Sequence, residues 1–278
     1  MSEFHHVSVL LEECIQGLAI KPDGIYVDGT LGGAGHSSRI AAKLTTGRLI
    51  GIDRDNVALE AAAERLRPFE DRVTLVHANF CNMDQALQEL GIDKVDGILL
   101  DLGVSSPQLD DGQRGFSYMT DAPLDMRMNG EDTRDARQIV NTWSYEELKR
   151  ILYDYGEERF APRIAAAICR HREQAPIETT LELVDVIKSA MPASALREKQ
   201  HPAKRSFQAI RIAVNDELGA VETVMKKAVP LLNPVGRLAV ITFHSLEDRI
   251  VKNAMAEAAK GCTCPPSFPV CVCGKKPQ

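Results

Sequence analysis

Long apolar runs are missing from this sequence. None approaches the ~20 consecutive apolar residues that a helix needs to cross a membrane, so we predict a protein without a membrane span. The N-terminal residues lack both a basic segment followed by an apolar core and an excess of arginine. We therefore expect neither a secretory signal nor an organelle transit peptide, and the predicted localisation is cytoplasmic.

The sequence also lacks an even number of cysteines and a net positive charge. The seven cysteines are odd in number, which argues against a simple disulfide framework. The formal net charge of −6 gives no general attraction to nucleic acid, so an RNA partner would need local basic patches. What remains is 278 residues, 44% hydrophobic and 26% charged, a composition typical of a globular protein with one large or two medium domains.

The most informative feature that is present is a glycine cluster behind a short apolar run. Residues 25–27 are apolar, Asp28 follows, and residues 29–35 then contain four glycines, Gly33 among them, before a helical pattern begins. A strand, a tight turn and a helix N-terminus in this order bind nucleotide-like cofactors, because glycine lets the backbone approach a ligand. Asp53 ends the next apolar run, where an acid usually contacts a ribose diol. We therefore predict a cofactor site on these residues.

The spacing of the glycines favours one cofactor. It reads G-x-x-G-G-x-G, which differs from the G-x-G-x-x-G of dinucleotide-binding proteins. A dinucleotide site holds a pyrophosphate at a helix N-terminus, and the carboxylate of Asp28 would repel it. That carboxylate suits the amino group or the sulfonium region of S-adenosylmethionine, which we favour over a nicotinamide or flavin cofactor. A glycine-rich turn without a ligand is the third interpretation, and Asp53 argues against it.

Strand and helix patterns alternate through the first hundred residues. Such alternation predicts an α/β fold with a doubly wound, mostly parallel sheet, whose ligands lie beyond the carboxyl ends of the strands. Asp28, Asp53, Phe80 and Asp101 all lie at or just past predicted strand ends. The predicted strands are 25–28, 48–53, 73–77 and 95–100, and the predicted helices are 37–44, 56–67 and 83–90.

The pattern changes beyond the fourth predicted strand. Residues 109–135 show no clear period, and the residues from 135 to 191 are predicted to form helices, one of them starting at a Ser-x-x-Glu capping box on Ser144. A strand pattern returns only at 236–242. We therefore predict a discontinuous sheet domain and an inserted helical domain that recognises the substrate, with bounds 1–108 and 205–278 for the first and 109–204 for the second.

Polar residues follow the fourth predicted strand, where a doubly wound transferase places its reactive methyl group. Asp101, Ser105 and Ser106 could accept hydrogen bonds from an exocyclic amino group. The segment lacks the aromatic residue that amino-methyltransferases often carry there. A turn-capping role is the structural alternative for Asp101.

A locally basic segment is the candidate RNA contact. Residues 197–211 contain five basic residues and one acidic residue, a local net charge of +4. Lys204 and Arg205 are therefore candidate phosphate contacts, and Phe207 is a candidate for stacking on a base. The alternative is a solvated helix start with Phe207 in the core.

A histidine follows the late strand. His244 is a candidate base or substrate contact, with a structural role as the alternative. Ser245 and Asp248 beside it fit a helix N-cap box, which needs no catalysis.

Four cysteines lie close together near the C-terminus, as two C-x-C pairs: Cys262, Cys264, Cys271 and Cys273. Four thiolates could hold a tetrahedral Zn²⁺, although this spacing is tighter than the common C-x₂₋₄-C. Two disulfides are the alternative in an oxidising compartment. We predict incidental thiols and no required metal.

Eight motifs together point to one family. They are DGTLGGAGHS at 28–37, DRD at 53–55, DLGVSSPQLD at 101–110, RGFS at 114–117, PLDMRM at 123–128, YGEERF at 155–160, RSFQA at 205–209 and FHSLEDR at 243–249. Over most of the chain, from His6 to about Lys252, the sequence resembles the bacterial small-subunit ribosomal RNA cytosine-N4 methyltransferases. Members of that family usually continue into an arginine-rich segment, whereas this sequence ends at Gln278.

The resemblance implies a class I S-adenosylmethionine-dependent methyltransferase fold with an inserted helical domain. It implies methylation of the exocyclic N4 of one cytidine in the decoding region of 16S ribosomal RNA. The implied partners are this RNA and the small ribosomal subunit, with the protein a monomer or homodimer. By the family pattern, the cofactor contacts map to Ala34, Gly35, His36, Asp53, Phe80, Asp101 and Gln108.

The chemistry of the reaction assigns roles to the residues near the methyl group. The cytosine amino group is a poor nucleophile because its lone pair is conjugated with the ring, so catalysis is mainly alignment of nitrogen, methyl and sulfur. An acceptor such as Asp101, assisted by Ser105 or Ser106, would favour lone-pair character and take up the proton. The base must also leave its stack.

Two other functions fit part of the sequence. One is a class I methyltransferase acting on a small molecule or protein, against which the basic segment argues. The other is a non-enzymatic ribosome-assembly protein that binds RNA and keeps only the fold. The intact glycine cluster with Asp53 and Asp101 argues against that second alternative.

Overall fold

The computed structural model describes residues 8–105, 108, 111–262, 264–265, 268–270, 272–274 and 276–277. The chain divides into two compact units, residues 1–103 with 218–278, and residues 104–217. The predicted insertion, residues 109–204, begins five residues later and ends thirteen residues earlier than this second unit. Among the described residues, no helix is long and apolar enough to cross a membrane.

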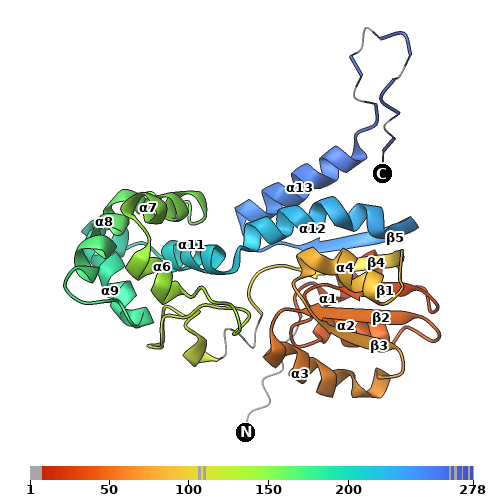
Figure 1. Ribbon diagram of the computed structural model, residues 1–278, viewed down its shortest axis with the longest axis horizontal. Helices are drawn as coiled ribbons and strands as arrows, with labels where there is room; N and C mark the ends of the chain where they lie inside the picture. The colour runs from red at the N-terminus through yellow and green to blue at the C-terminus, as the bar shows by residue number, and fades with distance from the viewer. Residues whose placement is uncertain are drawn as a thin grey trace. The chain divides into compact units, whose positions relative to one another are not determined.

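The first unit is built on a parallel sheet (Figure 1). Its described strands are β1 (Ile25–Asp28), β2 (Arg48–Asp53), β3 (Val73–His77), β4 (Val95–Asp101) and β5 (Leu232–Ile241). They lie in the order β3-β2-β1-β4-β5. Every neighbouring pair is parallel, so the carboxyl ends of the strands meet at one edge. This confirms the predicted doubly wound α/β fold.

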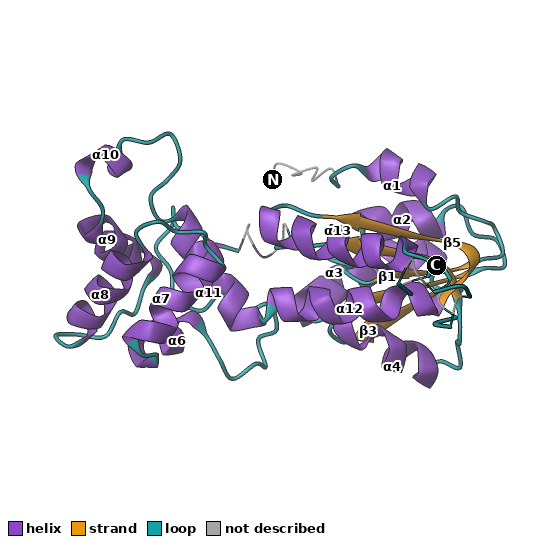
Figure 2. Ribbon diagram, turned by 90° about the horizontal axis from the view of Figure 1, so that it is seen from above, coloured by secondary structure: helices purple, strands orange, loops and turns teal. Residues whose placement is uncertain are grey.

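Apolar cores cover both faces of this sheet, and Figure 2 shows helices on either side of the strands. The helices of this unit are α1 (Leu11–Gly17), α2 (Gly35–Ala41), α3 (Asn56–Leu66), α4 (Met83–Glu89), α12 (Glu217–Leu231) and α13 (Ser245–Ala259), with short 3₁₀ turns η1 (Arg67–Phe69) and η2 (Phe80–Asn82). Val27, Ile98 and Leu100 belong to one core, which is closed by α4, α12 and α13. Their neighbours Tyr26 and Leu99 face the other core, closed by α1, α2 and α3. Burial on both faces explains why the strands read as continuous apolar runs.

The second unit is helical around a core of its own. Its elements are η3 (Gly112–Arg114), α6 (Ala136–Thr142), α7 (Tyr145–Asp154), α8 (Ala161–Arg172), α9 (Thr180–Ala190), α10 (Ala193–Leu196) and α11 (Lys204–Asn215). The predicted capping box is confirmed, because Ser144 Oγ accepts from the Glu147 amide at 3.3 Å and the Glu147 carboxylate accepts from the Ser144 amide at 2.7 Å. Thr179 and Glu182 form a second box of this kind.

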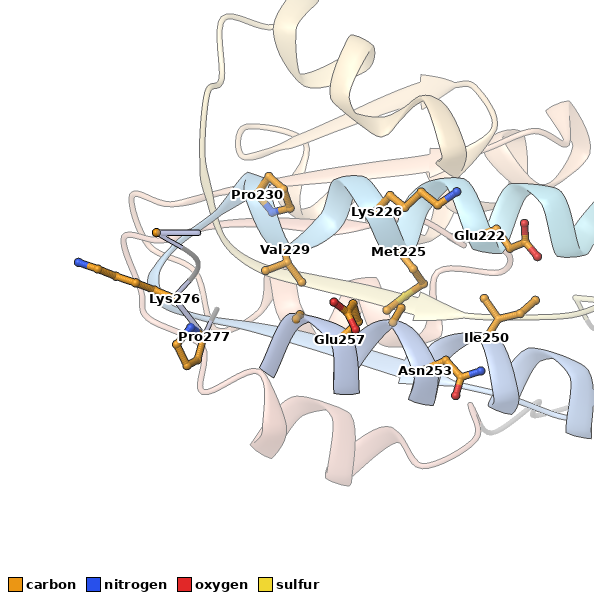
Figure 3. A pocket seen from close by; sticks show the side chains of 13 residues that line it. Glu222, Met225, Lys226, Val229, Pro230, Ile250, Asn253, Glu257, Lys276 and Pro277 are labelled. Carbon is orange, nitrogen blue, oxygen red and sulfur yellow. The ribbon is translucent and has the colours of Figure 1, made fainter. Parts of the chain in front are cut away.

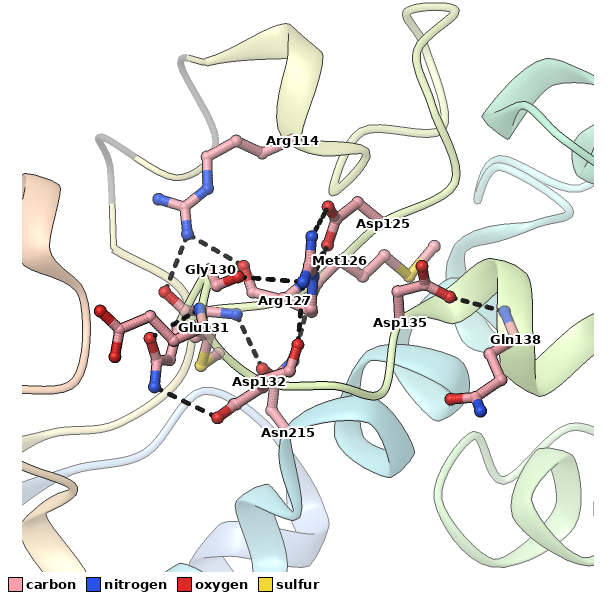
Figure 4. A network of polar contacts seen from close by, with 12 residues as sticks. Arg114, Asp125, Met126, Arg127, Gly130, Glu131, Asp132, Asp135, Gln138 and Asn215 are labelled. Carbon is pink, nitrogen blue, oxygen red and sulfur yellow. Dashed lines mark hydrogen bonds and ion pairs between the residues drawn. The ribbon is translucent and has the colours of Figure 1, made fainter.

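Polar contacts order the segment before α6, where the sequence shows no clear period (Figure 4). Arg127 binds the Asp125 carboxylate through two nitrogens, at 2.7 and 2.8 Å. Arg114 donates to the carbonyls of Arg127 and Met128 at 2.9 and 2.8 Å. The buried Asn215 of α11 accepts from the Met128 amide at 2.8 Å, so α11 is tied into the second unit.

Candidate cofactor and methyl-transfer site

The glycine turn connects the end of β1 to the start of α2. Gly32 has a φ of 47°, a left-handed conformation that favours glycine. A Cβ on Gly29 would lie 2.6 Å from Leu100 Cδ2, so the turn packs tightly against β4. A Cβ on Gly33 would meet nothing within 4 Å, so the backbone there is open to a ligand. Ala34 follows as the N-cap of α2, with its side chain fully buried.

Asp28, the last residue of β1, is held inside this turn. Its carboxylate accepts from Ser37 Oγ at 2.7 Å and from the Thr30 amide at 3.2 Å. Burial raises the pKa of Asp28, and the hydrogen bond from Ser37 acts in the opposite direction. The carboxylate therefore joins β1, the turn and α2 into one rigid feature.

Asp53, the last residue of β2, reaches the same turn. Its Oδ2 accepts from the Gly32 amide at 2.8 Å, and its Oδ1 accepts from the Asp55 amide at 2.9 Å. Burial raises the pKa of Asp53 as well, against these two hydrogen bonds. Each carboxylate oxygen has a further lone pair, so Asp53 retains the capacity to accept from a diol.

Asp101, the last residue of β4, completes the edge. Its amide donates to Thr30 Oγ1 at 2.6 Å, and its Oδ2 lies 3.8 Å from His36 Nδ1. His36 Nε2 lies 3.0 Å from the Val9 carbonyl oxygen, which fixes the ring. Phe80, beyond β3, borders the turn too, because a Cβ on Gly29 would lie 3.2 Å from Phe80 Cβ. The predicted residues of the first unit thus gather around one turn.

Two predicted residues after β4 lie in the second unit. The Ser105 amide donates to Gln108 Oε1 at 3.1 Å, and the Gln108 amide donates to the Ser105 carbonyl at 3.1 Å. Ser105 Oγ is buried and has no hydrogen-bond partner among the described residues. Ser106 lies outside the described residues. The roles of these three side chains remain predictions.

The structure leaves the candidate phosphate contacts of residues 197–211 exposed but buries the aromatic residue. Lys204 and Arg205 begin α11 and are exposed, and Arg205 donates to the Glu157 carbonyl at 2.9 Å. The stacking role for Phe207 is wrong, because its side chain is only 3% exposed and belongs to the core of the second unit. Its ring packs edge-on to Tyr118, with centroids 5.8 Å apart. On the amphipathic α11, the basic residues face outward and the aromatic residue faces inward.

His244 has a structural role in the first unit. It is the N-cap of α13 and forms a capping box with Glu247, so the predicted box of Ser245 and Asp248 is wrong. The Glu247 carboxylate accepts from the amides of Phe243 and His244, at 2.9 and 3.4 Å. A substrate contact by His244 stays a prediction.

An aromatic residue that the sequence did not predict lies at this edge of the sheet. Phe243, just beyond β5, is 57% exposed, and a Cβ on Gly103 would lie 3.5 Å from its Cδ2. It therefore lies beside the segment that follows Asp101, where the sequence lacks an aromatic residue. The sequence could have indicated this position, because loops that follow neighbouring parallel strands meet at the same edge of the sheet.

Comparisons with known proteins agree on one family. A sequence model described as the MraW methylase family matches residues 3–278. Proteins named Ribosomal RNA small subunit methyltransferase H are similar over nearly the whole chain. The one from Brevibacillus brevis is 59% identical over 274 residues, covering 98% of this chain and 87% of the relative. Those from Lachnospira eligens and Clostridium botulinum strain Kyoto are both 60% identical, covering 99% of this chain and 87% and 89% of the relatives.

Proposed function

Because this chain belongs to the MraW methylase family, we propose that it methylates the exocyclic N4 of a cytidine in the decoding region of 16S ribosomal RNA. It is an S-adenosylmethionine-dependent methyltransferase. The observation that carries the proposal is the gathering of three strand-end carboxylates, Asp28, Asp53 and Asp101, around a glycine turn with open space at Gly33.

The cofactor is proposed to lie along this edge. Asp53 accepts hydrogen bonds from the two ribose hydroxyls, because its carboxylate is already oriented by the Gly32 and Asp55 amides. The backbone from Gly33 to His36 borders the methionine part, and the negative charge of Asp28 behind it favours a cationic group over a phosphate. Phe80 offers an apolar ring surface to the adenine.

Asp101 is proposed to receive the proton of the reaction. When bound, S-adenosylmethionine supplies an electrophilic methyl group on a sulfonium that is a good leaving group. Asp101 accepts a hydrogen bond from the amino group, which increases lone-pair character on nitrogen. Methyl transfer onto N4 would release one of the amino protons, and the carboxylate of Asp101 would take it up. Ser105 and Ser106 are proposed to hold the second amino hydrogen.

Phe243 is proposed to stack on the cytosine ring. A base that has left its helix loses its stacking partners, and an aromatic side chain replaces them. Phe243 has the exposed ring that this requires, beside the segment that follows Asp101. Lys204, exposed at the start of α11, is proposed to contact an RNA phosphate.

A methyl-transfer assay tests the proposal. The protein is incubated with S-adenosylmethionine labelled in its methyl group and with small ribosomal subunits that lack the modification. Naked 16S RNA, ribosomal proteins and the Asp101→Asn variant serve as comparisons. Label in 16S RNA with the unchanged protein, and little label with the variant, supports the proposal. Label in protein, or RNA binding without any transfer, contradicts it and favours one of the two alternative functions.

A further inference from the structure

Three cysteines near the C-terminus converge in space. The sulfur atoms of Cys262, Cys264 and Cys273 all lie within 4.8 Å of one another. The sulfurs of Cys262 and Cys273 are 3.7 Å apart, and the residues are thiols rather than disulfides. The three come from both C-x-C pairs, so the chain folds back to bring them together. Cys271, the fourth cysteine of the pattern, lies outside the described residues.

The backbone around these cysteines is arranged to stabilise thiolates. The Cys264 amide donates to Cys262 Sγ at 3.4 Å, and the Val272 amide donates to Cys264 Sγ at 3.3 Å. A thiolate is the form of cysteine that binds metals.

The segment that carries the cysteines buries little apolar surface. Its large apolar side chains, Phe268, Val270 and Val272, are 50%, 70% and 73% exposed. Short segments without an apolar core are commonly held by a metal or a disulfide. The cysteines are the groups in this segment that can provide such a link.

The residues that follow the cluster lie against the first unit. Lys276 and Pro277 line a groove of about 860 Å³ between α12 and α13, together with Met225, Val229 and Ile250 (Figure 3). Fixing the cysteine loop would therefore also fix the residues that line this end of the groove.

We propose that Cys262, Cys264 and Cys273 bind one Zn²⁺ through their thiolates, and that the metal holds the C-terminal segment against α12 and α13. Thiolate sulfur donors favour Zn²⁺ among the common divalent ions. Binding displaces the thiol protons, so the affinity increases with pH. The proposal replaces the sequence-based expectation of incidental thiols, because the C-x-C spacing alone did not show that the two pairs converge.

Metal analysis of the full-length protein tests this site. The protein is purified under reducing conditions without chelators, and zinc is measured by elemental analysis. We expect about one Zn²⁺ per chain and a loss of at least about tenfold in the double variant Cys262→Ser with Cys264→Ser. Cys169→Ala, which removes a thiol from the second unit, should keep the metal.

Two further measurements do not depend on the variants. Replacement of the metal by Co²⁺ should produce an intense thiolate-to-cobalt charge-transfer band in the unchanged protein. Chelation should accelerate tryptic cleavage after Lys260, just before the cysteine loop, and zinc should restore protection. A zinc content below about a tenth per chain in reduced protein, with no such band on adding cobalt, would overturn the proposal. A disulfide between Cys262 and Cys273 in protein purified under reducing conditions would overturn it equally.

Discussion

Asp101 Oδ2 lies 3.8 Å from His36 Nδ1, which joins the end of β4 to the first turn of α2. This distance is too long for a hydrogen bond, and the Asp101 amide also donates to Thr30 Oγ1 of the glycine turn at 2.6 Å. The proposed proton acceptor is therefore positioned by the same glycine turn that is proposed to hold the cofactor.

Asp101→Asn should reduce turnover strongly. Asparagine keeps the shape of the side chain but cannot take up the N4 proton, and general base catalysis contributes about 10²- to 10⁴-fold. Single-turnover methyl transfer gives the rate, and calorimetry with the cofactor shows whether binding is retained. Asp96→Asn, at the opposite end of the same strand, is the matched control and should remain active. Equal rates for Asp101→Asn and the unchanged protein would remove Asp101 from the mechanism.

Asp53→Ala should weaken cofactor binding by about one to two decades, because a hydrogen bond to a charged group contributes roughly 1.5–3 kcal/mol. Isothermal titration calorimetry gives the dissociation constant. Thermal unfolding without cofactor reports the separate loss of the hydrogen bonds from Gly32 and Asp55. The exposed Asp71, changed to Ala, is the control. An unchanged dissociation constant would place Asp53 outside the site.

Cofactor affinity should fall at acidic pH. Burial raises the pKa of Asp53, and the ionised carboxylate is the form that accepts both hydroxyl hydrogens. The affinity should be highest above the raised pKa of Asp53. It should decrease as the pH falls through that pKa, by up to about tenfold per pH unit for each linked proton. Asp53→Asn removes one linked proton, so its profile should be flatter. Parallel profiles for the two proteins would contradict this assignment.

Lys204→Ala should weaken RNA binding and reduce its salt dependence. Loss of one phosphate contact lowers the slope of log K against log salt by about 1. Fluorescence anisotropy over a salt series measures this slope, with the exposed Lys43→Ala as control. Arg205→Ala should in addition lower the melting temperature, because Arg205 bonds the Glu157 carbonyl. A slope unchanged by Lys204→Ala would assign Lys204 to the solvated surface.

Phe243→Ala should lower kcat/KM for RNA about tenfold to a hundredfold, since stacking of a base on an aromatic ring contributes about 1–3 kcal/mol. Phe243→Tyr should retain most of the activity, and both variants should bind the cofactor normally. Steady-state kinetics with small subunits gives the ratio. Full activity of Phe243→Ala would exclude stacking as the means by which the base is held.

The sheet and its ligand edge followed from local patterns in the sequence. Strands buried on both faces read as apolar runs, and the glycine turn with Asp28 and Asp53 marks their carboxyl ends. The bounds of β1, β2 and β3 agree with prediction, whereas β5 begins at Leu232 rather than 236. These features depend on residues close together in the chain, so the sequence alone could indicate them.

Features that depend on distant residues were harder to predict. Phe207 lies on the inner face of α11 because the rest of the second unit packs there, which a basic local composition does not reveal. Phe243 comes near Gly103 only because β5 pairs with β4. The convergence of Cys262 with Cys273 requires the chain to reverse direction between them. In each case the contact joins segments that are distant in the sequence, and no short sequence pattern predicts that these segments come together.

The identity of the methylated nucleoside is the sharpest test of the proposed methylation at cytosine N4. Small subunits lacking the modification are treated with the protein and labelled S-adenosylmethionine, and the 16S RNA is digested to nucleosides for chromatography and mass spectrometry. We predict that the label appears in N4-methylcytidine and that it disappears with Asp101→Asn. Label in a ring-carbon-methylated cytidine, in another nucleoside, or in none at all would contradict it.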